Sequence, residues 1–453
     1  MTPTEHFTFS IHSNTSKNVS RPTPKFVLST STINAVPLTE SIHRVNLTPW
    51  DLELLFLDYS QKGLLLRKPN PQQEATILSK TNTTSLIHHL KASLERTLHF
   101  FSPLLGRLAT TKSDDGSTTC FFIDCDNINE KGALFIHATA LDTNLSVADI
   151  LDSSTYVPEI VPSFFPLKGT RNRDGVSQPL LAVQVTELVD GLFIGCSINH
   201  LLVDATSFWH FFNSWAEISR GDHENFVHDP ISKLPILNRD QLTLDLVGSS
   251  DIKIYNEYRI LDKVSAAHES PCLLRDRVFH FTKESVAKLK ARANKEVVES
   301  ARQRLNPPLP EEYFGNSVFP GIVTTEAWKI LENGLGWTSR QIHKMVASAN
   351  GPDKVKEFYM SWIKKPNFLQ FDGLPSNHFI LINSPRFDVY GNDFGWGKPV
   401  AARSGRANSF DGRITIYGGF EKGSLEIEAC LFPETLSALV NDAEFMEFVK
   451  SDF

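Results

Sequence analysis

The sequence predicts an α/β protein built from two domains. Its 453 residues are enough for two domains with full hydrophobic cores. Residues 192–215 begin as an almost entirely apolar strand and continue as a helix whose apolar residues recur at helical spacing. The two halves of the chain show a similar content of expected strands and helices. We therefore expect two related α/β units.

The expected elements of the first half follow from local signals. Thr48 and Pro49 supply the N-cap and the first residue of a helix. Leucines at helical spacing predict a second helix over 84–98. Alternating or continuous apolar runs predict strands at 26–30, 118–124, 133–138, 179–187 and 192–198. The last two form a hairpin around the turn Asp190-Gly191.

The second half begins after a stretch without clear periodicity. This stretch carries Pro230, Pro235 and mixed charges, which is typical of a crossover between domains. A strand at 278–281 and a helix at 285–294 follow it. The first residues are rich in Ser, Thr and Asn and lack an apolar period, so we expect them to be disordered. The predicted organisation is an extension at 1–25, a first domain at 26–220, a linker at 221–250 and a second domain at 251–453.

Composition excludes several classes of function. The net charge is −7 and no dense Lys/Arg stripe occurs, which argues against a nucleic-acid partner. The longest apolar runs have the length of core strands, so no membrane span is expected. Five cysteines, an odd number, without a secretory signal indicate free thiols in a reducing, cytoplasmic compartment. The His and Cys spacing matches no zinc site, so we expect no metal.

His200 is the first candidate for chemistry. It follows the strand 192–198, where a side chain is held rigidly and still reaches a cleft, and its near-neutral pKa suits a general base. Strand alternation places it in line with Cys196 and Ile198, so burial should lower its pKa and keep it neutral near pH 7. Asp204 follows four residues later and can cap the next helix. The alternative interpretation is a core histidine bonded to a backbone carbonyl.

A second candidate segment lies at residues 392–399. Gly395 and Gly397 flank Trp396, which predicts a tight turn that carries a large indole. Taken alone, this segment is better explained as a packed surface turn. The glycines and the preceding Asp393 are candidates for a structural role.

Together these segments resemble a known family. The pattern HxxxD at 200–204 and the pattern DFGWG at 393–397 are the signature pair of the BAHD acyltransferases, the plant acyl-CoA-dependent transferases. Four further motifs match in family order: LTPWD at 47–51, PLLGRL at 103–108, YFGN at 313–316 and SGRAN at 404–408. The resemblance implies two domains similar to chloramphenicol acetyltransferase, with mixed sheets and an active-site tunnel at their interface.

The resemblance also implies an activity and residue roles. The expected reaction moves an acyl group from an acyl-CoA thioester to a hydroxyl or amine of a plant specialised metabolite. Acyl-CoA is then a co-substrate, no cofactor stays bound, and the enzyme acts as a monomer on a small-molecule acceptor. His200 would remove the acceptor's proton, and the indole N–H of Trp396 is the suggested donor to the tetrahedral oxygen. Asp204 would pair with an arginine, and Asp393 with the arginine matching Arg302.

The chain departs from the family pattern at two points. Ala205 stands where members usually have glycine, which matters only if the position needs a positive φ. After Asn294, about 40 residues that would form one helix and one strand seem absent. Their loss would expose core surface and a sheet edge. A gene-model or splicing error and a genuine deletion both explain this gap, and we prefer the former because the flanks match so closely.

Two other functions remain open. Residues 47–69 are similar to the branch that contains the plant isochorismoyl-glutamate lyase of salicylate synthesis, which needs no coenzyme A. A lyase on the same fold is therefore the main alternative. The missing segment makes a non-catalytic, truncated family member the third hypothesis.

Overall fold

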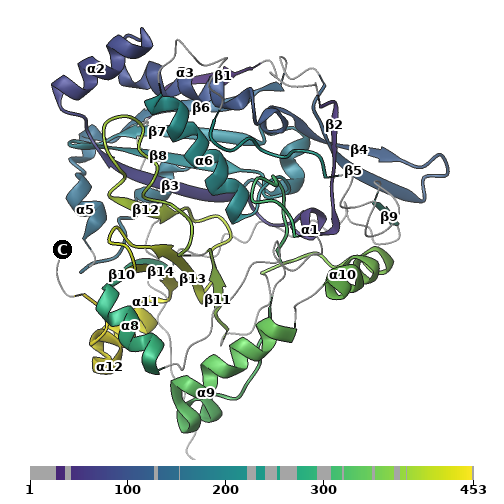
Figure 1. Cartoon of the computed structure of the whole chain (residues 1–453), viewed down its shortest axis with the longest axis vertical. Coiled ribbons are helices and arrows are strands. Elements are labelled where there is room, and N and C mark those ends of the chain that lie inside the picture. Colours follow the sequence, from purple (N-terminus) through teal and green to yellow (C-terminus); the bar gives the residue numbers. More distant parts are fainter. Residues whose placement is uncertain are drawn as a thin grey trace, which may run out of the picture.

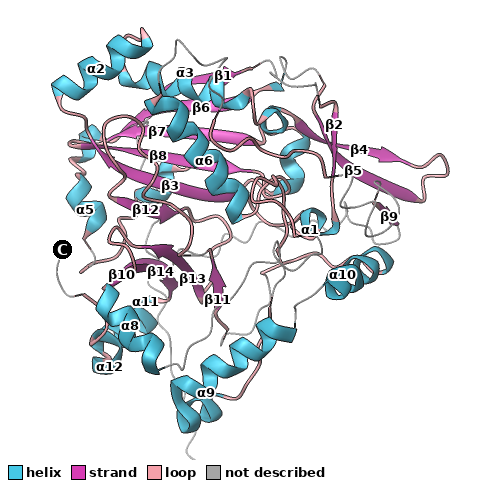
Figure 2. Cartoon of the chain, in the orientation of Figure 1, coloured by secondary structure: helices cyan, strands magenta, loops and turns pink. Residues whose placement is uncertain are grey.

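The computed structural model describes most of the chain in three sheets with flanking helices (Figures 1 and 2). The described residues are 27–35, 42–126, 131–152, 154–221, 231–239, 252–255, 273–292, 308–318, 321–348, 352–371, 378–383 and 385–450. The extension at 1–25, Arg302 and most of the linker 221–250 lie outside them, so the predictions for these segments stay predictions.

A mixed six-stranded sheet forms the centre of the molecule (Figure 2). Its strands in spatial order are β1 (Val27–Ile33), β6 (Ala133–Thr139), β7 (Leu181–Glu187), β8 (Gly191–Ile198), β3 (Ser60–Arg67) and β12 (Ala401–Ser404). Only the β6–β7 pair among them is parallel. The hairpin expected around Asp190-Gly191 is confirmed as β7–β8. The edge strand β12 comes from the second half of the chain.

Helices cover both faces of this sheet. On one face, α3 (Leu86–Leu98) and α6 (Ala205–Arg220) pack their leucine, phenylalanine and tryptophan side chains onto the alternate residues of β8 that include Ile194 and Cys196. On the other face, Phe193 contacts the rings of Phe164 and Phe165. Both faces of β8 are therefore buried, which explains its nearly continuous apolar sequence.

A second sheet belongs to the second half of the chain. Its order is β10 (Arg275–Phe281), β14 (Leu425–Leu431), β13 (Arg413–Gly418) and β11 (Ile380–Ile382), with β11 parallel to β13. It carries its own apolar cluster, to which α8 (Lys283–Arg292), α11 (Pro433–Asn441) and α12 (Ala443–Met446) contribute. A third sheet combines β2 (Arg44–Asn46), β5 (Thr118–Asp124), β4 (Arg107–Lys112) and β9 (Lys253–Tyr255).

The other α-helices among the described residues are α1 (Pro49–Leu52), α2 (Pro71–Thr81), α5 (Val147–Leu151), α9 (Ala327–Ser348) and α10 (Pro352–Lys364). Thr48 caps α1 as predicted, through a capping box with Asp51. The two-domain α/β class is confirmed. The halves nevertheless exchange strands, because β9 pairs with β5 and β12 pairs with β3. The boundaries at 220 and 251 remain predictions.

The surface around α9 and β11 is unusually apolar. No residue of α9 is buried, and the helix kinks at Gly334, whose φ is 71°. Trp328 and Leu331 on α9, and Phe379 and Leu381 around β11, are all more than half exposed. β11 is also an edge strand. This agrees with the exposed core surface and sheet edge expected from a missing helix and strand.

Candidate active site

His200 lies immediately beyond the end of β8, and hydrogen bonds fix its backbone on both sides. Its N–H donates to Oδ1 of Asn172 at 2.7 Å, and its carbonyl accepts from Nδ2 of Asn316 at 2.7 Å. The neighbouring Asn199 donates its side-chain amide to the carbonyl of Asn172 at 2.8 Å. The turn that carries His200 is therefore held without the use of the imidazole.

The imidazole of His200 is half-buried and chemically available. Nδ1 is shielded from water and has no hydrogen-bond partner in the described part of the chain. Burial lowers the pKa of His200, a change that the Lys62 charge reinforces and that Asp204 opposes. The neutral ring is thus the stable form near pH 7, as a general base requires.

Asp204 acts at the start of α6. Its carboxylate accepts from the N–H of Ser207 at 2.9 Å and from Oγ of Ser317 at 3.4 Å. It is therefore the N-cap residue that the sequence predicted. Its expected pairing with an arginine stays a prediction. Ala205 is the first helical residue and is not among the described residues with positive φ, so alanine causes no strain there.

A buried ion pair lies beneath the His200 turn. Arg239 Nη1 and Asp51 Oδ2 are 2.9 Å apart, and both side chains are almost completely shielded from solvent. Arg239 also donates to the carbonyls of Leu201 and Leu202, at 3.3 and 2.8 Å. Asn316 joins the network by donating to Asp51 Oδ1 at 2.8 Å. Three distant segments thereby brace the residues that follow His200.

The turn around Trp396 has the tight geometry that the sequence predicted. Gly395 and Gly397 have φ values of 112° and 138°, which glycine tolerates best. Both donate their N–H groups to Oδ1 of Asp393, at 2.8 and 2.9 Å. Asp393 thus closes the turn itself. Its expected pairing with Arg302 concerns a residue outside the described part.

Trp396 does not lie near His200. Its indole N–H donates to the carbonyl of Arg67 at 3.1 Å. Arg67 pairs with Gly191 at the start of β8, whereas His200 follows the end of that strand, about 23 Å further along the sheet. The same turn packs on the last residues of α6, since Ser219 Oγ donates to the carbonyl of Phe394. This geometry does not support Trp396 as the donor to a tetrahedral oxygen.

Lys62 brings a charge into the space between the two large sheets. It stands directly across from Cys196 of β8 and Ser404 of β12. Its Nζ lies 3.4 Å from Ser404 Oγ and 5.5 Å from the ring centroid of Tyr417 on the second sheet. Burial lowers the pKa of Lys62 to about 8. Sequence analysis missed this lysine because it stands in a strand without any catalytic pattern.

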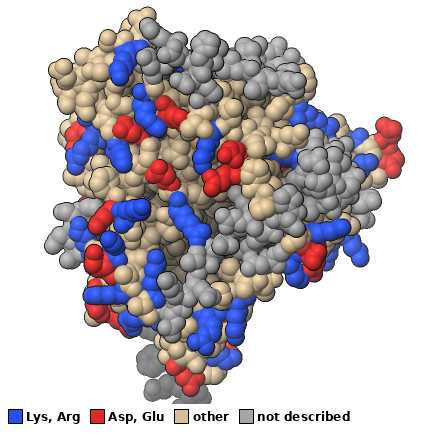
Figure 3. Space-filling model, viewed as in Figure 1, with Lys and Arg blue, Asp and Glu red and all other residues tan. Residues whose placement is uncertain are grey.

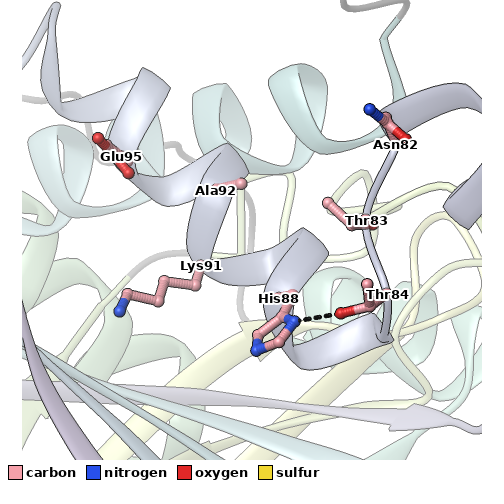
Figure 4. A pocket seen from close by; sticks show the side chains of 7 residues that line it. All are labelled: Asn82, Thr83, Thr84, His88, Lys91, Ala92 and Glu95. Atoms are coloured by element: carbon pink, nitrogen blue, oxygen red, sulfur yellow. Dashed lines mark hydrogen bonds between the residues drawn. The ribbon is translucent and has the colours of Figure 1, made fainter.

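Two hollows among the described residues lie elsewhere. One, of about 330 Å³, is lined by Asn82, Thr84, His88 and Lys91 at the start of α3 (Figure 4). A second lies between α3 and the strands β1, β6 and β7. Neither includes His200, so the expected tunnel stays a prediction. In the described residues no cluster of His, Cys, Asp or Glu fits a metal ion.

The surface charge, the helix hydropathy and the cysteines give little information about binding partners. Acidic and basic side chains alternate over the face shown in Figure 3, without a large area of one sign. Within the described ranges, no helix is both long and apolar enough to cross a membrane. Cys120, Cys125, Cys196 and Cys430 are buried free thiols, and Cys272 lies outside the described residues.

Comparison with known proteins decides the family. A model of the Transferase family matches residues 27–301 and 297–446, which is most of the chain. The chain is also 31% identical to the BAHD acyltransferase DCR of Arabidopsis thaliana, over 88% of each chain. The chain belongs to the BAHD acyltransferase family. The two matched stretches meet at 297–301, just after the point where the sequence departs from the family pattern.

A second relative from the same plant matches almost over its full length. The chain is 38% identical to the protein Enhanced Pseudomonas Susceptibility 1 of Arabidopsis thaliana, with 93% of this chain and 98% of the relative covered. That alignment runs over 462 positions, more than the 453 residues of the chain, so it includes positions that this chain lacks.

Solved structures show the fold. Vinorine synthase matches with a TM-score of 0.60 at 17% identity, over 94% of this chain and 98% of the other. TRI101 of F. graminearum, solved with coenzyme A and T-2 mycotoxin, matches with a TM-score of 0.64 at 14% identity, over 90% and 99%. The expected BAHD architecture of two α/β units with mixed sheets is confirmed.

Several residues of this BAHD site escaped sequence analysis. Asp51 and Asn316 stood in quoted family motifs, but nothing indicated that they meet beneath His200. Arg239 lay in the expected linker, where no periodicity suggested a buried side chain. Asn172 belongs to an irregular segment. A buried polar network of this kind is visible only once the chain is folded.

Proposed function

We propose that the chain transfers an acyl group from an acyl-CoA thioester to a hydroxyl or amine of a plant specialised metabolite, with His200 as general base. The observation that carries the proposal is the imidazole of His200. It stands at a strand end on a braced backbone, its Nδ1 has no partner among the described residues, and burial lowers its pKa. Family membership supplies the reaction class.

The chemistry requires only one proton carrier. The neutral imidazole accepts the acceptor's O–H or N–H proton while the oxygen or nitrogen bonds to the thioester carbonyl carbon. The tetrahedral species then collapses, the carbon–sulfur bond breaks, and the thiolate leaves as the imidazolium returns its proton to sulfur. Ser207 is not needed as a nucleophile, because its Oγ is engaged with the Gly315 backbone. Cys196 is a core residue whose burial raises its pKa.

The test follows free thiol release from a panel of acyl-CoAs offered with alcohols and amines. His200→Gln should reduce transfer by about 10²-fold or more. Its melting temperature should stay close to that of the parent, because the described hydrogen bonds of this turn use backbone atoms. His88→Gln on the exposed start of α3 is the matched control and should retain activity. Transfer that persists in His200→Gln would exclude the proposed base.

The main alternative is a lyase on the same fold. Residues 47–69 support it through their similarity to the branch that contains the isochorismoyl-glutamate lyase. Turnover of isochorismoyl-glutamate without coenzyme A, together with no thiol release from any acyl-CoA, would replace the transferase proposal. If both activities are absent, sequencing of the transcript separates a truncated family member from an error in the chain after Asn294.

The same proposal includes a cytoplasmic monomer with acyl-CoA as co-substrate and no bound cofactor. The four described cysteines support a reducing compartment, because none forms a disulfide. Fluorescent tagging would test the location, and light scattering of the purified protein would test the monomeric state.

A further inference from the structure

Lys62 occupies the face of the central sheet that leads to His200. Residues directly opposite each other in paired strands project to the same face. Lys62 is opposite Cys196, which lies in the alternating row that continues through Ile198 towards His200. The residue is only 8% exposed. The ammonium is therefore held between the two large sheets, close enough that its charge contributes to the lowered pKa of His200.

The hydrogen-bonding capacity of this ammonium is largely unused. An ammonium carries three N–H donors. Among the described residues its polar contact is a weak one, to Ser404 Oγ at 3.4 Å, supplemented by the Tyr417 ring. No described carboxylate lies within ion-pair distance of Nζ. Ser404 itself is shared, because its Oγ lies 2.8 Å from the Tyr417 hydroxyl.

Three neighbouring arginines each contact a buried carboxylate. Arg413 and Arg406 contact Asp276 at 2.9 and 3.2 Å. Arg403 contacts Glu426 at 3.5 Å. Among the described residues of this region, Glu428 is a further buried carboxylate.

Glu428 is committed to other groups. It accepts from the N–H of Ser404 at 2.8 Å and lies 3.9 Å from Arg413. Its negative charge favours the protonated form of Lys62, but the two groups are not within ion-pair distance in the described structure. A buried charge without its own partner lowers the stability of the folded protein unless a ligand supplies the opposite charge.

We propose that Lys62 binds a carboxylate of the substrate and thereby orients the substrate towards His200. The inference rests on the proposed function and names a substrate class for the same site. One ammonium compensates one negative charge, which fits a carboxylate better than a phosphate with up to two charges. The carboxylate belongs either to a dicarboxylic acyl group on coenzyme A or to an acidic acceptor.

The first experiment measures carboxylate binding through thermal stability and does not depend on acyl transfer. The probe is malonate, and malonamide is its neutral counterpart. Malonate should raise the melting temperature of the parent protein by several degrees, whereas malonamide should not. Lys62→Met should abolish the shift, and Lys62→Arg should retain part of it. Lys131→Met, which removes a half-buried lysine paired with Asp124, is the control and should keep the full shift. An equal shift in Lys62→Met, or none in the parent, overturns the proposal.

Kinetic comparison identifies the source of the carboxylate. Malonyl-CoA and acetyl-CoA form the donor arm, and hydroxy or amino acids with their methyl esters form the acceptor arm. Lys62→Met should raise KM at least tenfold for the charged member of one arm and leave the neutral member unchanged. Equal effects on charged and neutral substrates contradict the proposal.

The two arms also separate this inference from the proposed function. If the parent shows a malonate shift that needs Lys62 but transfers no acyl group, the transferase proposal fails and the carboxylate site stands. If the parent transfers acyl groups and Lys62→Met does not distinguish charged from neutral substrates, the carboxylate site fails alone.

Discussion

Asn316 donates its side-chain amide to the backbone carbonyl of His200 at 2.7 Å, although 116 residues separate the two in sequence. The same amide reaches Asp51 Oδ1 at 2.8 Å. One side chain of the second half therefore sets the position of the His200 turn against α1. Because the contact is made to the backbone, it fixes the position from which the imidazole projects.

The first prediction concerns this contact. Asn316→Ala leaves a buried carbonyl and part of a buried carboxylate without their donor, which should cost about 1–3 kcal/mol of unfolding free energy. Acyl transfer should fall about tenfold or more, with the loss in kcat rather than KM, because the base is displaced. Urea unfolding and steady-state kinetics measure the two effects. Asn333→Ala, which removes an exposed amide bonded within α9, should change neither.

The second prediction concerns pH. Burial places the pKa of His200 below its usual 6.5, and only the neutral ring accepts a proton. For substrates without a carboxylate, kcat/KM should therefore be constant above pH 7 and fall as pH drops through this lowered pKa. A pH–rate profile checks the position of the acid limb. A limb centred at or above pH 6.5 would contradict the stated environment of His200.

The third prediction compares two ion pairs close in sequence. Arg239→Met removes one partner of the buried pair with Asp51, which should cost about 3–5 kcal/mol. Lys233→Met breaks an exposed pair with Glu311 and should cost less than about 1 kcal/mol. Denaturant unfolding of both variants measures the difference. Similar costs for the two would show that the buried pair does not brace the His200 turn.

The fourth prediction concerns Trp396. Trp396→Phe removes the hydrogen bond to the Arg67 carbonyl and should lower stability by about 1 kcal/mol. The kcat/KM should stay within about threefold of the parent, because the indole lies at the end of β8 remote from His200. Trp328→Phe on the exposed side of α9 controls for loss of an indole. A drop of 10² or more in kcat with unchanged stability would restore a direct catalytic role for Trp396.

Local signals predicted local structure well. The strand expected at 118–124 is β5, residue for residue, because apolar residues bounded by polar ones define it. Thr48 and Asp204 cap helices as expected, since capping depends on a few neighbouring atoms. The helix expected at 285–294 is shifted by two residues, to Lys283–Arg292.

Contacts between segments far apart in the chain could not be predicted from the sequence. No local pattern shows that β12 leaves the second half to pair with β3, because strand partners are chosen by tertiary packing. Likewise, the sequence shows Lys62 only as one polar residue in a strand. Its burial beside Ser404 and Tyr417 becomes visible in the folded chain. His200 was identified from its position after a strand and from its motif. Trp396 was assigned to the same site only because the two motifs occur together in the family, and this says nothing about the distance between them.

The pairing of β12 with β3 also has a consequence for synthesis. Residues 401–404 complete the sheet that carries His200. They emerge from the ribosome about 200 residues after β8, so the edge of β3 has no strand partner for the interval in which those residues are added. At roughly 5–20 residues per second this interval lasts about 10–40 s. During that time the nascent chain presents an unpaired strand edge, where pairing with another chain would lead to aggregation.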